Sequence, residues 1–82
     1  MVDVLFDDFF KRFFFKIRDN LLKEKIIKQI KKLKENPEAG KPMMNVRKGT
    51  RELYISSFRL SYIYYKDKKI VEILELYHKK KQ

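Results

Sequence analysis

The sequence predicts a single α+β domain: a short N-terminal strand, an antiparallel two-helix hairpin and a three-strand antiparallel meander. Apolar residues recur at helical spacing over the first 35 or so positions, whereas the second half holds runs rich in aromatic and β-branched residues. Both glycines and both prolines lie between these halves. No repeat, linker or composition break divides the chain, so residues 1–82 are expected to form one domain.

The first strand and helix follow from the N-terminal residues. Met1 to Phe6 reads as a short strand, and Asp7 or Asp8 is suited to cap the next helix, because a carboxylate accepts hydrogen bonds from free backbone N–H groups. One apolar stripe on this helix is expected to be core: Phe6, Phe9, Phe10, Phe13, Phe14 and Ile17. Phe15 lies off the stripe, and its expected exposure hints at a partner surface.

The second helix begins after the Asp19-Asn20 break. Its apolar positions recur at helical spacing, and lysines cover the other face: Leu22, Ile26, Ile30 and Leu33 form the stripe. Asn36-Pro37 ends this helix, because the residue before proline avoids the helical region. The break between the helices is short, which predicts an antiparallel helical hairpin packed on one face of the sheet.

A long connection over residues 38–50 leads to the sheet, and Val46 is a candidate start of a short strand. Ser56-Ser57 is short enough for a hairpin turn, and Lys66–Lys69 is a polar turn. The expected meander strands are Arg51–Ile55, Phe58–Tyr65 and Ile70–Tyr77.

Charge is the strongest signal in the composition. Lys and Arg number 21 against 11 Asp and Glu, which gives a formal net charge of +10. A polyanionic partner is therefore expected, nucleic acid first and an acidic protein second. The alternative is a solvated basic surface without a dedicated partner.

Several function classes are excluded by composition. The chain has no cysteine and one histidine, so disulfides, thiolate zinc sites and histidine metal clusters are excluded, and no cofactor motif is present. No apolar run approaches the roughly 20 residues of a membrane span, so a cytoplasmic protein is expected. Glu72 and Glu75 are three residues apart in a strand, which places them on opposite faces and makes them poor acid–base partners.

Arg59 is the leading candidate for a functional residue. In its strand, Arg59 and Ser61 share one face while Leu60 and Tyr62 share the other, so Arg59 is expected on the open face of the sheet. A cation there is suited to hold a phosphate. The structural alternative is a cross-strand ion pair with Glu52 or Glu72.

Other cations are expected to converge on Arg59. If the last strand runs antiparallel to Phe58–Tyr65, its basic end returns beside Arg59, bringing His78, Lys79 and Lys80. Convergent cations stabilise the charge that develops on a phosphodiester, and a tyrosine or histidine can move the proton of a ribose 2′-hydroxyl. Such a site cleaves RNA without a metal. Further RNA contacts are expected before or at the opening of the hairpin: Arg47, Lys48 and Arg51.

Three motifs together carry a family resemblance. Phe58-Arg59-Leu60-Ser61-Tyr62 resembles the aromatic-Arg-apolar-x-Tyr strand of the RelE/ParE superfamily of toxins from toxin–antitoxin modules. Leu33 to Pro42 is similar to the helix exit of that superfamily, and Ile73 to Lys80 to its last strand. The resemblance covers almost the whole chain and implies a single RelE-like toxin domain with a β-α-α-β-β-β core.

The resemblance also implies a function. RelE-like toxins cut messenger RNA in the ribosomal A site, leaving a 2′,3′-cyclic phosphate and a 5′-hydroxyl. An acidic, RelB-like antitoxin wraps and inactivates the toxin, and the resulting hetero-oligomer often binds operator DNA. The mid-strand arginine of the family matches Arg59, and its terminal basic pair matches Lys79 and Lys80, with lysine where arginine is usual.

The sequence departs from the family pattern at two places. Glu52, with Arg51 beside it, stands where many members have a basic residue. The tyrosine that serves many members as a base, on a C-terminal helix, is expected to have no counterpart, and the resemblance then implies that Tyr77 or His78 substitutes or that the nuclease is weakened. The ParE branch shares the fold but poisons DNA gyrase, and a binding-only RNA-binding domain is a further alternative. Arg59 and the basic tail favour the RNase branch.

Overall fold

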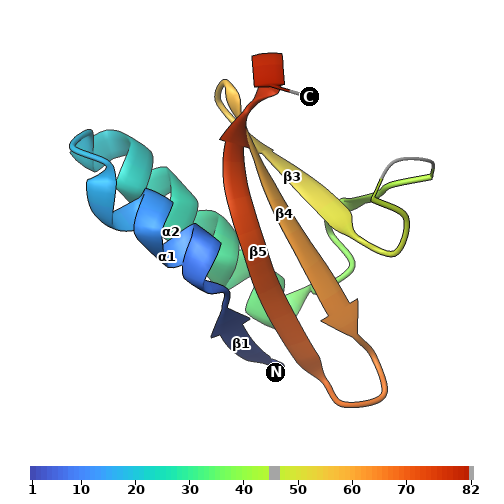
Figure 1. Cartoon of the computed structure of the whole chain (residues 1–82). Helices are drawn as coiled ribbons and strands as arrows, with labels where there is room; N and C mark the ends of the chain where they lie inside the picture. Colours follow the sequence, from blue (N-terminus) through green and yellow to red (C-terminus); the bar gives the residue numbers. More distant parts are fainter. Residues whose placement is uncertain (45–46, 82) are drawn as a thin grey trace.

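The computed structural model describes residues 1–44 and 47–81, so the proposed strand start at Val46 lies outside the described residues. Two helices, α1 (Asp8–Lys16) and α2 (Asn20–Glu35), pack on the same side of a five-stranded sheet (Figure 1). The strands are β1 (Asp3–Phe6), β2 (Lys41–Pro42), β3 (Arg51–Ile55), β4 (Phe58–Tyr65) and β5 (Ile70–His78). A 3₁₀ turn, η1 (Lys79–Lys81), follows β5. The predicted α+β fold with its β3–β4–β5 meander is confirmed.

The sheet has the order β1-β5-β4-β3-β2 and is mixed rather than wholly antiparallel. The N-terminal strand β1 runs parallel to β5, with Val4 beside Val71, while the remaining neighbours are antiparallel. The two-residue strand β2 extends the opposite edge. The helical pair occupies the crossover from β1, which is why a parallel neighbour is possible there.

Capping residues define both helix starts. The Asp7 carboxylate accepts the N–H of Phe9 at 2.9 Å, and Asp19 accepts those of Leu21 and Leu22. The predicted aromatic stripe is narrower than expected, because Phe10 is buried whereas Phe9 is 70% exposed. Phe15, as predicted, is exposed, at 76%.

A β-bulge changes the face alternation of β5. Ser61 pairs with Glu75 and the next residue, Tyr62, pairs with Ile73, so Leu74 is an extra residue in β5. The buried positions of β5 accordingly switch from Val71 and Ile73 to Leu76. Glu72 and Glu75 therefore lie on the same face, away from the helices, and the prediction of opposite faces is wrong because it assumed an unbroken two-residue period.

Tyr62 joins the sheet to the exit of α2. Its hydroxyl accepts the backbone N–H of Gly40 at 2.8 Å and donates to the Pro37 carbonyl at 2.8 Å. Burial raises the pKa of the Tyr62 phenol above its ordinary value, although the Gly40 hydrogen bond acts in the opposite direction. Arg51 supports the same connection, donating to the carbonyl oxygens of Gly40 at 2.8 Å and Glu38 at 3.1 Å.

Candidate functional site

The candidate site lies on the sheet face opposite the helices. Direct cross-strand partners form a row there, with Tyr54 of β3 and Tyr77 of β5 flanking Arg59 of β4. Leu60 and Tyr62, on either side of Ser61, are fully buried on the helical side. Arg59 therefore projects from the face where the strand alternation placed it.

Aromatic and backbone contacts hold Arg59. Its guanidinium carbon lies 3.8 Å from the centre of the Tyr54 ring, and its Nη1 donates to the Phe58 carbonyl at 3.2 Å. Over residues 1–44 and 47–81 it forms no ion pair with Glu52 or Glu72. The guanidinium is thus fixed in place without internal neutralisation by a carboxylate.

Glu52 and Tyr77 form a hydrogen bond across the central strand. The Tyr77 hydroxyl donates to Oε2 of Glu52, although β3 and β5 lie on opposite sides of β4. Ser61, the β4 residue between them, is small enough for the Tyr77 ring to pass over it. Glu52 is only 3% exposed and Ser61 1%, and within the described residues the Ser61 Oγ has no hydrogen-bond partner.

Arg47 covers the outer side of this pair. Its guanidinium lies 4.6 Å from the centre of the Tyr77 ring and forms an ion pair with Glu75 at 2.5 Å. Lys48, beside it, is exposed. Arg51, the third predicted RNA contact, is engaged in the α2 exit and with Glu38 at 3.6 Å, so the structure does not bring it to the Arg59 face.

The basic tail is only partly gathered at the site. The backbone N–H of Lys79 donates to the Ser57 carbonyl at 2.9 Å, which holds the tail against the β3–β4 turn. Lys79 and Lys80 are exposed beside that turn. His78 pairs with Phe58, and their rings meet edge to face at 5.3 Å, so His78 points to the helical side, away from Arg59.

From the sequence, Glu52 is expected as a departure from the family pattern or as an ion-pair partner of Arg59, and its hydrogen bond with Tyr77 is not predicted. Its partnership with Tyr77 depends on a contact between strands that are not neighbours in the sheet. The one local sign of this Tyr77–Glu52 contact in the sequence is a small residue, Ser61, in the middle of a strand of large side chains. In the described part of the chain, no three His, Cys, Asp or Glu residues lie close enough together to hold a metal ion.

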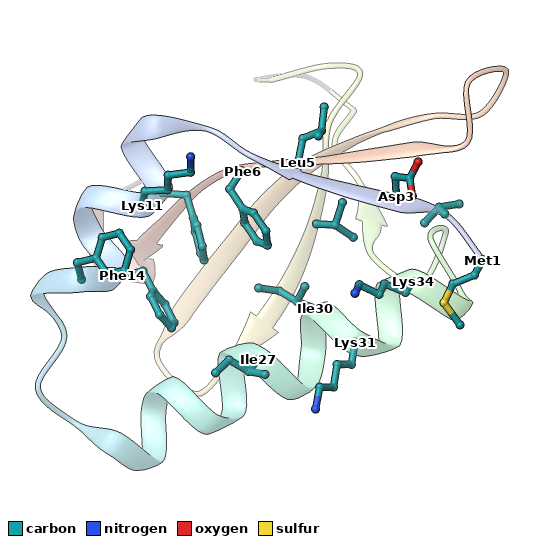
Figure 2. Close-up of a pocket in the computed structure, with 14 residues that line it drawn as sticks. Met1, Asp3, Leu5, Phe6, Lys11, Phe14, Ile27, Ile30, Lys31 and Lys34 are labelled. Atoms are coloured by element: carbon teal, nitrogen blue, oxygen red, sulfur yellow. The ribbon is translucent and has the colours of Figure 1, made fainter.

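A second feature lies on the other side of the molecule. A groove of about 880 Å³ runs between β1, α1 and α2, and Phe6, Phe14 and Ile30 line it (Figure 2). Lysines stand around this apolar floor: Lys11, Lys31 and Lys34. Because β1 is an edge strand, its outer backbone groups have no strand neighbour in the described sheet.

No helix in the described ranges has the length and apolar character needed to cross a bilayer.

The fold is a mixed sheet covered on one side by two helices, and the opposite face of the sheet carries Arg59. Together with the net positive charge, these features define a class of small basic domain. The family model described as the ParE toxin of the type II toxin-antitoxin system, parDE, matches residues 4–82. The chain therefore belongs to this toxin family, within the RelE/ParE superfamily. A comparison with curated protein sequences finds no match.

Solved structures share the fold. The YoeB/ParE toxin from Agrobacterium tumefaciens superposes with a TM-score of 0.82 at 18% identity, covering 94% of this chain and 98% of that one. The RelBE2 toxin-antitoxin complex from Mycobacterium tuberculosis gives 0.81 at 24% identity, covering 94% and 96%. The intact E. coli RelBE complex gives 0.79 at 17% identity, covering 93% and 94%. At these identities the likeness shows the fold.

Proposed function

We propose that this toxin is a metal-independent endoribonuclease that cuts messenger RNA on the ribosome and so inhibits translation. One observation carries the proposal: Arg59 is fixed on the open face by Tyr54, has no carboxylate partner in the described residues, and lies beside Tyr77. An arginine held in this way can stabilise the additional negative charge of a phosphorane. Residues 1–82 act as a single toxin domain in the cytoplasm, where the ribosomes are.

The Tyr77–Glu52 pair supports a route for the proton. As the ribose 2′-oxygen bonds to phosphorus, its proton passes to the Tyr77 oxygen while the Tyr77 proton passes to Glu52. The bond from phosphorus to the 5′-oxygen breaks, and the ammonium group of Lys79 or Lys80 protonates the leaving oxygen. The products are a 2′,3′-cyclic phosphate and a 5′-hydroxyl. Arg47 and Lys48 contact flanking phosphates, whereas His78, on the helical side, is not part of this route.

An acidic antitoxin is the proposed protein partner. The RelBE structures that share this fold are toxin–antitoxin complexes. The groove between β1, α1 and α2 offers an apolar floor and lysine rim, which suits an amphipathic helix with an acidic outer face. The hetero-oligomer of toxin and antitoxin would hold the toxin inactive and bind operator DNA.

Gyrase inhibition is the second candidate, because the matching family model is that of a ParE toxin. A paired assay separates the two. Purified toxin is added to a ribosome programmed with a defined message and, separately, to a DNA gyrase supercoiling reaction. The proposal expects cleavage with cyclic phosphate ends and unaffected supercoiling. Blocked supercoiling with an intact message would assign the chain to the gyrase-directed branch.

A further inference from the structure

Tyr54 has an exposed aromatic surface that the cleavage route does not use. It is 58% exposed, and among the exposed large side chains of the described residues it is the one that β3, β4 and β5 contribute. The Arg59 guanidinium lies 3.8 Å from the centre of its ring, so one part of the ring is occupied and the remainder faces solvent. The other tyrosine of the row, Tyr77, is covered by Arg47 and hydrogen-bonded to Glu52.

We infer that Tyr54 is a stacking platform for one nucleobase of a single-stranded RNA, next to the phosphate that Arg59 binds. The inference rests on the proposed function, because it places an RNA strand on the open face. Each base has an aromatic face, so stacking on a tyrosine accepts any base and adds to the phosphate contacts. Tyr54 would thus hold the strand while Arg59 acts at the phosphodiester.

The geometry suits one nucleotide. Tyr54 and Arg59 are direct partners on adjacent strands, which lie about 4.8 Å apart, a separation that one ribose can bridge between a base and its phosphate. The contact with Arg59 also orients the tyrosine ring before any ligand arrives. A ring that is already ordered loses little further freedom on binding.

Charge favours RNA over a protein on this face. The nearby carboxylates are engaged, Glu52 with Tyr77 and Glu75 with Arg47, whereas Arg59 has no such partner in the described ranges. The chain has a net charge of +10, and on this face the positive charge of Arg59 is one that a polyanion would neutralise. An exposed tyrosine beside an arginine also occurs at protein interfaces, so a protein ligand is one outcome of the test.

The test uses the full chain and a pair of RNA strands. One is a fluorescent 2′-O-methyl RNA of about eight nucleotides, which cannot be cut. The other has the same sugar-phosphate backbone without bases. Binding of both is measured at low salt for the wild type, Tyr54→Phe and Tyr54→Leu, with circular dichroism to check folding. Cleavage of a message on a programmed ribosome is measured for the same proteins, and this second assay tests the proposed function separately.

The stacking site predicts a loss of binding for one variant and one RNA strand only. Tyr54→Leu should bind the intact RNA about 10-fold more weakly, within the range for the loss of one base–aromatic stack, while Tyr54→Phe binds as the wild type. On the abasic strand all three should bind equally. This comparison isolates stacking, because a loss that arose from a displaced Arg59 would appear on both strands.

Contrary outcomes separate the two proposals. If the wild type cuts message but Tyr54→Leu binds the intact RNA normally, the stacking site is wrong and the nuclease stands. An equal loss on both strands also overturns stacking. If the stacking result appears without cleavage, the nuclease proposal fails and the base site stands. If the wild type neither cuts nor binds either strand, both fail. Unchanged RNA binding by Tyr54→Leu together with weaker inhibition of the gyrase supercoiling reaction would make Tyr54 a protein contact and overturn the inference.

Discussion

Gly40 donates its backbone N–H to the hydroxyl oxygen of Tyr62 at 2.8 Å, and the approach is so close that the glycine has no room for a side chain. A Cβ at Gly40 would lie 2.6 Å from the Tyr62 ring atom Cε1. Through this contact, the connection after α2 is attached to the central strand β4. The glycine of the helix-exit motif is thus required for packing against a specific tyrosine.

We expect Gly40→Ala to destabilise the fold by about 1–3 kcal/mol, the usual range for overpacking. The cost should fall in a Tyr62→Leu background, because the ring that causes the clash is then absent. Chemical denaturation of the wild type, both single variants and the double variant measures this coupling. Additive free energies of unfolding would mean that the clash with Tyr62 is not the cause.

Alkaline pH should weaken the fold through Tyr62. Burial raises its pKa in the folded state, so the unfolded phenol, with a pKa of about 10, loses its proton first. The Tyr62 contribution is therefore fully present below about pH 10 and is lost as pH rises through the folded-state pKa. Tyr62→Phe should lose less stability over this pH range than the wild type. Equal losses would show that Tyr62 does not control alkaline unfolding.

Arg59→Ala should reduce message cleavage on the order of 10²–10³-fold, as for other preorganised donors. Its effect on the free energy of unfolding should stay near 0.5–1 kcal/mol, roughly the value of an exposed cation–π contact. Arg12→Ala, which removes an exposed arginine from α1, is the matched control and should cut normally. A variant that melts far lower yet cuts at full rate would make Arg59 a structural residue.

Glu52→Gln tests the proton route. The amide keeps the shape of the carboxylate and can still accept the Tyr77 hydrogen bond, so the melting temperature should change little. Cleavage should fall roughly 10²–10⁴-fold, because the amide cannot take up the proton. Glu72→Gln, on the same sheet face but hydrogen-bonded to Tyr65, is the control and should retain most activity. Full activity of Glu52→Gln would place the base elsewhere.

Phe15→Glu tests the antitoxin groove. Phe15 lines the groove, so an acidic group there should weaken binding of an acidic antitoxin by more than tenfold, on the order of 1.4 kcal/mol or more, with little effect on folding because Phe15 is exposed. Phe9→Glu makes the same charge change on α1 at an exposed residue outside the groove lining. Titration calorimetry with the antitoxin of the native operon compares them. Equal losses would indicate a charge effect and not a docking site.

Much of the fold followed from the sequence because its signals are local. Asp7 and Asp19 cap helices through contacts two or three residues away, and Asn36-Pro37 ends α2 for a reason contained in one dipeptide. The side on which Arg59 stands follows from the two-residue period of its own strand. These features needed no knowledge of distant parts of the chain.

Tertiary structure decided what depends on partners far apart in the sequence. The parallel pairing of β1 with β5 joins the two ends of the chain, and the bulge at Leu74 arises where β5 pairs with β4, moving Glu75 to the face of Glu72. Tyr77 reaches Glu52 only because small Ser61 lies between them in the assembled sheet. Strand pairing is set by long-range hydrogen bonds and packing, so a periodic pattern alone cannot specify it.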